Sequence, residues 1–213
     1  MQKKFIIITG RSGCGKGTQS EMLESYLKKI YEENKNDSGL EVKHVTTGGN
    51  FREFIKNENY TAVKTRDTIN SGGLMPEFLA IWNWSNIFIN NLKENMTVIL
   101  DGTPRRMIEV DALRTAIPFY GYDSATIIYL DVSEEWTRKR LIERGREDDR
   151  NEEEVSKKMK WFTEDMLPCI KYYEEESVKK NTKENNSYKF LHINGEQSVE
   201  DVNAEILQKL NLI

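Results

Sequence analysis

The stretch Phe5-Ile-Ile-Ile-Thr-Gly-Arg-Ser-Gly-Cys-Gly-Lys-Gly-Thr18 decides the fold. Its first five residues, Phe5–Thr9, are apolar or β-branched without interruption. Such a run predicts a strand that is buried on both faces of a parallel sheet. The glycine-rich turn that follows leads into a helical pattern. This order of strand, turn and helix indicates a phosphate-binding loop.

The residue types in this turn fit phosphate chemistry. Glycines allow backbone N–H groups to point inward, and the helix N-terminus adds its positive dipole. We expect Lys16 to reach the β- and γ-phosphates of a nucleotide, and a nearby hydroxyl to bind Mg²⁺. Gly17 stands where that hydroxyl usually lies, so Thr18 is the candidate. The alternative is a plain glycine-rich turn with a surface lysine, and the flanking strand and helix favour the phosphate loop. Cys14 is interpreted as a small filler, not a nucleophile.

Similar apolar runs recur along the chain and alternate with stretches in which apolar residues follow helical spacing. Further strands are expected at Val42–Thr46, Thr97–Leu100, Thr126–Leu130 and Tyr188–Ile193. Helices are expected at Thr18–Tyr31, Pro76–Leu92, Ser133–Arg144, Glu152–Glu176 (with a kink at Pro168) and Ser198–Leu210. Two polar stretches, Glu32–Gly39 and Lys179–Ser187, are interpreted as solvated loops. The pattern predicts one doubly wound α/β domain over residues 1–213, a five-stranded parallel sheet flanked by helices.

Composition excludes several classes of protein. The 213 residues are 38% hydrophobic and 31% charged, with a net charge of -4, which argues against a protein built mainly to bind nucleic acid. The two cysteines cannot form a disulfide framework, and no Cys/His cluster has the spacing of a zinc site. Neither a signal peptide nor a membrane span is recognisable. We therefore expect a cytoplasmic monomer whose partners are small molecules.

Charged side chains follow the second and third expected strands. Thr47 can cap the next helix and so place Arg52 about one turn in, towards an anion, although a capped helix with an exposed arginine is equally common. Asp101 ends the third strand, where a carboxylate beside a phosphate loop can hold hydrated Mg²⁺. Arg105 on the adjoining turn can bind a second phosphate in bidentate fashion. The alternative is an ordinary aspartate turn with surface arginines.

An arginine cluster closes the helix after the fourth strand. Arg140 and Arg144 lie four residues apart and share a helix face. Gly145 can end that helix and let Arg146 turn back to the same side. Such a cluster can neutralise the charge of a transferring phosphoryl group. A solvated charge run is the alternative, and the phosphate loop elsewhere in the chain disfavours it.

In this order of motifs the chain resembles the adenylate kinase family of nucleoside monophosphate kinases. The motifs span nearly the whole chain and are Gly10–Gln19, Thr46–Arg52, Gly73–Pro76, Asp101–Leu113, Arg140–Asp149 and Asn194–Gly195. The resemblance implies a helical segment near residues 47–76 that binds the nucleoside monophosphate (NMP), and a lid near residues 145–151 that closes over the substrates.

The resemblance also implies roles for individual residues. The ATP-binding set is Gly13, Cys14, Gly15, Lys16, Gly17, Thr18, Arg140, Arg144 and Gly195, the last beside the adenine. The NMP-binding set is Thr47, Arg52, Gly73, Leu74, Met75, Gly102, Thr103, Pro104, Arg105 and Glu109. The catalytic set is Lys16, Arg105, Arg144, Arg146 and Lys158, and Mg²⁺ is expected near Thr18 and Asp101 through water.

The sequence departs from the family at several positions. The lid is of the short type without zinc cysteines, and the first helix-to-strand connection is longer than usual. Gly49 stands in place of an aspartate, Thr103 in place of a phenylalanine and Lys158 in place of an arginine. Glu109 stands in place of the glutamine that reads the adenine of AMP. A carboxylate only accepts hydrogen bonds, so Glu109 would meet the adenine amino group well and the N1 lone pair badly, unless it is protonated or turned away to solvent.

These observations predict in-line transfer of the ATP γ-phosphoryl group to AMP, with Mg²⁺ and no protein general base. A kinase for GMP, a pyrimidine or a deoxynucleoside monophosphate is the first alternative, because guanine offers two adjacent donors that suit a carboxylate. An inactive nucleotide-binding regulatory module is the second. The retained lysine and arginines argue against it, since a simple binder needs no groups for the transition state.

Overall fold

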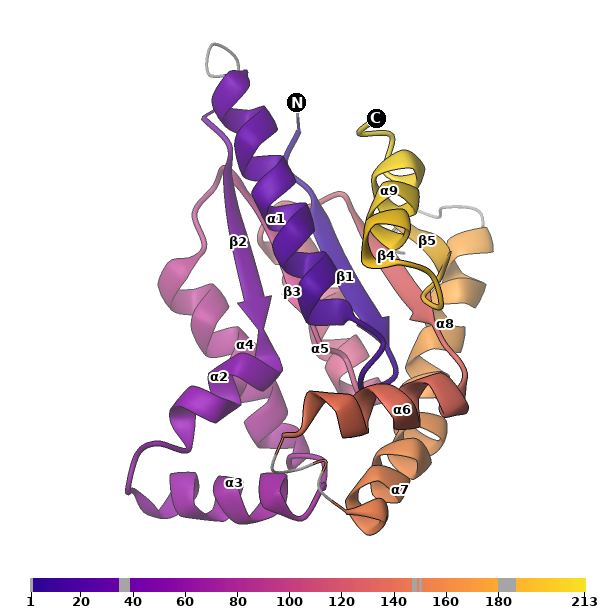
Figure 1. Ribbon diagram of the computed structural model, residues 1–213. Helices are drawn as coiled ribbons and strands as arrows, with labels where there is room; N and C mark the ends of the chain where they lie inside the picture. Colours follow the sequence, from indigo (N-terminus) through magenta and orange to yellow (C-terminus); the bar gives the residue numbers. More distant parts are fainter. Residues whose placement is uncertain (1, 35–38, 147–148, 150, 180–186) are drawn as a thin grey trace.

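The computed structural model describes residues 2–34, 39–146, 149, 151–179 and 187–213. Parts of the predicted loops at 32–39 and 179–187, and of the predicted lid at 145–151, lie outside these residues. The described strands form one parallel sheet in the order β2-β3-β1-β4-β5 (Figure 1). Their bounds are β1 Phe5–Gly10, β2 Glu41–Thr46, β3 Met96–Asp101, β4 Ser124–Asp131 and β5 Ser187–Asn194. The predicted parallel α/β fold is confirmed, with every strand within two residues of its expected bounds.

Helices cover both faces of this sheet. One face packs on α1 (Lys16–Glu33) and α9 (Val199–Lys209), and the other on α4 (Glu77–Asn91), α5 (Met107–Phe119) and α8 (Leu167–Val178) (Figure 1). Successive residues of β1 divide between the two cores: Ile6 and Ile8 face α1 and α9, whereas Phe5 and Ile7 face the other side. This alternation explains why the strand reads as a continuous apolar run.

The remaining helices gather at the carboxyl edge of the sheet. They are α2 (Thr47–Phe54), α3 (Tyr60–Asn70), α6 (Glu134–Arg144) and α7 (Glu152–Trp161), drawn at the bottom of Figure 1. Parallel strands direct all their carboxyl ends to one edge, so the loops that leave β1, β2, β3 and β4 meet among these helices.

The structure corrects two local predictions. Thr46, not Thr47, caps α2: its hydroxyl accepts a hydrogen bond from the Gly49 N–H at 3.3 Å, while Thr47 is the first helical residue. The predicted helix Glu152–Glu176 is divided by a π-helical turn, Phe162–Met166. Pro168 follows this turn, and because proline has no N–H and crowds the carbonyl four residues earlier, the widened turn accommodates it.

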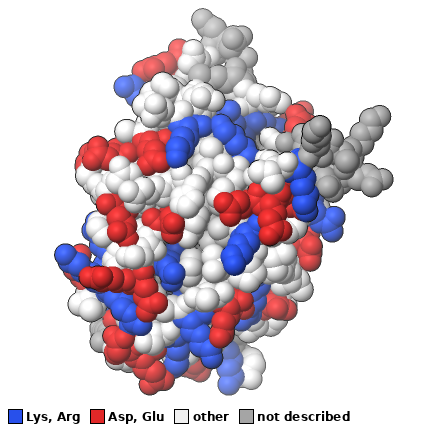
Figure 2. All heavy atoms as spheres, turned by 90° about the vertical axis from the view of Figure 1, so that its right-hand side faces the viewer, with Lys and Arg blue, Asp and Glu red and all other residues white. Residues whose placement is uncertain are grey.

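The surface carries charges of both signs. Figure 2 shows the face over α8, β5 and α9, where lysine and arginine side chains are interspersed with aspartate and glutamate. Within the part of the chain that the structure describes, no helix is sufficiently long and apolar to cross a membrane.

Stability depends on the α1 face of the core. Leu27 of α1 is fully buried, whereas Ile89 of α4 is 74% exposed. We expect Leu27→Ala to lower the free energy of unfolding by about 2–5 kcal/mol, because it opens a cavity in a close-packed core. The matched control, Ile89→Ala, should change it by less than about 0.5 kcal/mol. Urea unfolding followed by circular dichroism measures both, and equal losses would contradict the placement of α1.

Candidate active site

A large cavity opens at the carboxyl edge of the sheet. Its volume is about 740 Å³, within the range of nucleotide-sized ligand sites. It is lined by the turn between β1 and α1, the ends of β2 and β3, the start of α2, one side of α6 and the turn after β5. Of the predicted residues, it gathers Gly13, Cys14, Gly15, Lys16, Gly17, Thr18, Arg52, Asp101, Gly102, Arg105, Arg140, Arg144, Arg146 and Gly195.

Glycine is required where β1 turns into the cavity. Gly10 has φ +143°, and a β-carbon there would lie 2.5 Å from the carbonyl oxygen of Leu130 in β4. Gly15 has φ +94° and is the N-cap of α1. Because side chains disfavour these backbone conformations, the loop depends on glycine to keep its backbone close to the sheet and wrapped over the N-terminus of α1.

Lys16 lies across the loop. Its Nζ donates hydrogen bonds to the carbonyl oxygens of Gly10 and Arg11, both at 2.8 Å. The Cys14 thiol lies beside it, 3.6 Å from Nζ, and is buried. Burial raises the pKa of Cys14, although the neighbouring Lys16 charge opposes this shift. A thiol of raised pKa is a poor nucleophile, which supports the interpretation of Cys14 as a filler.

An oxygen-rich corner adjoins the loop. Thr18 and Asp101 both line the cavity, and a β-carbon on Gly17 would lie 3.8 Å from Asp101 Oδ2. A hydroxyl and a carboxylate near a phosphate loop fit the oxygen ligands that Mg²⁺ prefers. Among the described residues, no group of three or more His, Cys, Asp or Glu side chains is arranged to hold a metal ion.

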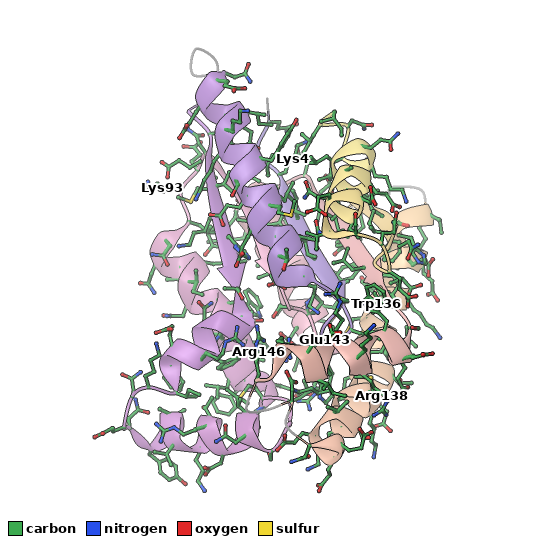
Figure 3. The ribbon with its side chains drawn as sticks, in the orientation of Figure 1. Lys4, Lys93, Trp136, Arg138, Glu143 and Arg146 are labelled. Atoms are coloured by element: carbon green, nitrogen blue, oxygen red, sulfur yellow. The ribbon has the colours of Figure 1, made fainter. Side chains whose placement is uncertain are left out.

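Arginines enter the cavity from three directions. Arg52 comes from α2, Arg105 from the turn after β3, and a third group from α6 and the residues just after it: Arg140, Arg144 and Arg146. Figure 3 shows Trp136 and Glu143 on the side of α6 towards the loop, and Arg138 on the side towards α7. The Arg140 guanidinium carbon lies 5.0 Å from the centre of the Trp136 ring, which is a cation–π distance.

Two of the predicted catalytic cations share one buried carboxylate. Asp149 accepts hydrogen bonds from Arg144 Nη2 at 2.6 Å and from Lys158 Nζ at 2.5 Å. The side chains of Asp149 and Lys158 are 0% and 5% exposed, respectively. Burial makes this pairing necessary, because an uncompensated charge in the interior is costly. Neither Lys158 nor Asp149 is among the residues that line the large cavity.

A second, narrow pocket lies next to the cavity. It is lined by Phe51, Leu74, Met75, Thr47, Thr103, Arg105, Arg106 and Glu109, among others. Arg105 lines both spaces. Gly102, which lines the cavity, has φ +82°, and a β-carbon there would lie 3.1 Å from Thr47 Oγ1 of the pocket. Gly73 and Pro104 do not line either space, although they adjoin residues that do.

Glu109 does not face solvent. It is 2% exposed, and its Oε1 accepts hydrogen bonds from the backbone N–H groups of Arg105 at 2.9 Å and Arg106 at 3.3 Å. Its Oε2 lies 3.3 Å from the Thr103 hydroxyl. Burial raises the pKa of Glu109, and the hydrogen bond from the Arg105 N–H is the largest opposing effect. The alternative of a solvent-facing side chain is therefore wrong, because this carboxylate caps the start of its own helix.

Sequence reasoning missed three residues of the site. Trp136 lines the cavity beneath Arg140, and Asp149 pairs with Arg144 and Lys158. Arg106 donates to the Met75 carbonyl oxygen at 3.1 Å and lies 3.2 Å from Asp165, so it joins the two walls of the narrow pocket. Only Trp136 had a usable signal, since it lies four residues before Arg140 on the same helix face.

Comparison with known proteins agrees with this geometry. The adenylate kinase family model matches residues 8–178. Among curated proteins, the adenylate kinase of Bacteroides fragilis is 30% identical over 212 residues, covering 98% of each chain. The adenylate kinase of Prochlorococcus marinus (strain MIT 9515) is 31% identical over 212 residues, covering 98% of this chain and 99% of its own.

The adenylate kinase of Bacteroides thetaiotaomicron is 30% identical over 210 residues, covering 97% of both chains. The family model thus matches most of the chain, and these relatives match nearly its full length. The cavity is lined by residues from the same motifs. The chain belongs to the adenylate kinase family of nucleoside monophosphate kinases.

Proposed function

We propose that this protein transfers the γ-phosphoryl group of ATP to AMP, forming two molecules of ADP. The observation that carries the proposal is the convergence of the phosphate loop and arginines from α2, the β3 turn and α6 on one cavity. The phosphate loop accounts for the binding of one nucleotide. Cations arriving from the opposite side are expected where a second phosphate must be aligned with the first.

The two nucleotides are assigned to different parts of the site. ATP would lie over the loop with its adenine near Gly195, where Trp136 and Arg140 provide a flat, stacked pair. AMP would lie with its phosphate near Arg52 and Arg105 and its base at the narrow pocket, whose volume of about 20 Å³ in this structure would have to increase to admit a purine. Residues 47–76 then act as the NMP-binding segment, and residues 145–151 as a short lid that excludes water in the manner of lids in this family.

Transfer would need little covalent chemistry from the protein. Lys16 would leave its carbonyl partners for the β- and γ-phosphates, and Arg105, Arg144 and Arg146 would neutralise charge on the transferring group. Thr18 and Asp101 would hold the Mg²⁺ of Mg-ATP through water, and the ion supplies additional charge neutralisation when bound. Lys158 would act through Asp149, which it shares with Arg144, and we propose no general base.

Acceptor choice is the direct test of this function. Purified protein with Mg-ATP should phosphorylate AMP with a higher kcat/KM than GMP, CMP, UMP or dTMP, measured by chromatographic separation of the products. A preference for GMP would overturn the acceptor. Nucleotide binding without turnover of any acceptor would favour an inactive regulatory module.

Removal of the loop cation tests the donor site. Lys16→Met should reduce turnover to background, because its ammonium group is the cation of the phosphate loop, while circular dichroism stays unchanged. The matched control is Lys93→Met at the far end of the sheet (Figure 3), where Lys93 is exposed and pairs with Glu41. Wild-type turnover in Lys16→Met would refute the assignment of the loop.

The α6 cluster can be tested on a single helix. Arg144→Ala should lower kcat by about 10²-fold or more if the guanidinium acts on charge that develops during transfer. Arg138→Ala is the control, because Arg138 lies on the opposite side of α6 and pairs with Glu134 and Glu152 (Figure 3). A change confined to the KM for ATP would show that Arg144 contributes only to ground-state binding.

A further inference from the structure

Two residues that depart from the family pattern are in contact with each other. Thr103 replaces a phenylalanine and Glu109 a glutamine, and their side chains meet in the narrow pocket. Thr103 Oγ1 and Glu109 Oε2 are 3.3 Å apart. Both residues are 2% exposed and both line the pocket. Two substitutions that share a buried hydrogen bond are best interpreted together.

The Glu109 carboxylate is fixed in orientation. Its Oε1 is occupied by the backbone N–H groups of Arg105 and Arg106 at 2.9 and 3.3 Å, which hold the carboxylate at the start of α5. Rotation of the group would leave these buried donors unpaired, which is unfavourable. Only Oε2 is left to face the pocket, and it lies next to the Thr103 hydroxyl.

The two groups together have the hydrogen-bonding capacity of a glutamine amide. An amide both donates and accepts, a carboxylate accepts, and a hydroxyl can do either. The Watson–Crick edge of adenine presents an acceptor at N1 beside a donor, the 6-amino group. One acceptor and one donor on adjacent side chains match this edge.

We propose that Thr103 and Glu109 jointly read the adenine of the acceptor nucleotide: Glu109 Oε2 accepts from the 6-amino group, and the Thr103 hydroxyl donates to N1. The inference rests on the proposed function, since it places the acceptor base in this pocket. In the empty pocket the hydroxyl and Oε2 satisfy each other. When adenine is present the hydroxyl turns to N1, so neither buried group is left unpaired in either state.

In the orientation that pairs with adenine, this arrangement disfavours the 6-oxo purines. Hypoxanthine and guanine carry a carbonyl oxygen at position 6 and an N–H at position 1. Glu109 Oε2 would then face a second acceptor, with no proton between them. Such an opposition weakens binding, because the buried carbonyl oxygen of the base finds another acceptor in place of a donor. The pair therefore selects the amino purine even though the family's glutamine is absent.

The experiment combines a protein change with changes in the base. Thr103→Val keeps the size of the side chain and removes the hydroxyl, whereas Thr103→Ser is the matched control that retains it. The substrates are AMP, 1-deaza-AMP (C–H in place of N1), purine riboside 5′-monophosphate (no 6-amino group) and 7-deaza-AMP, whose Watson–Crick edge is intact. kcat/KM is measured for each at saturating Mg-ATP.

The wild type should have about the same kcat/KM for 7-deaza-AMP as for AMP. Its kcat/KM should be about tenfold lower, or more, for 1-deaza-AMP and for purine riboside monophosphate. Relative to wild type, Thr103→Val should lower kcat/KM for AMP by about tenfold or more. It should not change kcat/KM for 1-deaza-AMP, because that base has no N1 to accept a hydrogen bond from the hydroxyl. Thr103→Ser should remain near wild type. IMP and GMP should be poor acceptors of the wild type.

The outcomes separate this inference from the proposed function. If the wild type phosphorylates AMP but Thr103→Val is equally active, or loses as much with 1-deaza-AMP as with AMP, the shared reading of adenine is wrong and the AMP kinase assignment stands. If the wild type prefers IMP or GMP, both are wrong. Thermal unfolding and the KM for ATP show whether Thr103→Val is folded, and Thr103→Ala serves in its place if it is not.

Discussion

The sharp exit of the backbone from the central strand is the constraint on which the rest of the site depends. β1 lies between β3 and β4, and at Gly10 the chain passes so close to Leu130 that a β-carbon would not fit. The loop is thereby held at the middle of the sheet edge, directly above the N-terminus of α1. Thr46 and Asp101 reach the cavity from the ends of β2 and β3, so their distance from the loop is set by the sheet register, whereas the arginines enter from α2, from the turn after β3, and from α6 and the residues just after it.

In the structure three of the predicted cations of the site are paired within the protein itself. Lys16 donates to carbonyl oxygens of its own loop, and Arg144 and Lys158 share the carboxylate of Asp149. A buried cation without a partner would be costly, so internal partners occupy these positions where phosphate is expected. Under the proposed function, nucleotide binding is an exchange of partners. Its net free energy is then the difference between two sets of charged hydrogen bonds.

Sequence patterns predicted β1, β3 and β4 well because a strand buried on both faces is apolar nearly throughout, whereas the edge strand β2 is only partly buried. The predicted strands were too short at their ends, where polar residues such as Glu41 and Asn194 also pair with the neighbouring strand. The two adjacent threonines Thr46 and Thr47 were equally suited to cap α2, and only the pairing of Thr46 with Asp101 shows where the strand stops.

Side-chain partners were harder to predict than elements. The glutamate three residues after Arg106 has the spacing of a helix cap, and that signal could have indicated that Glu109 turns towards its own backbone. The pairing of Asp149 with Arg144 and Lys158 had no local signal, because it depends on the bend of the chain after α6 and on the packing of α7.

The burial of both cysteines has a practical consequence for work with this protein. Cys14 is 5% exposed and Cys169 is 1% exposed, and burial raises the pKa of each, that of Cys169 to about 12. Alkylating reagents and peroxides react with accessible thiolates, so the folded native chain presents them with no ready target. A cysteine introduced on the surface would thus be labelled selectively with a fluorophore, and the movement of α2 or α6 could be followed without first replacing the native residues.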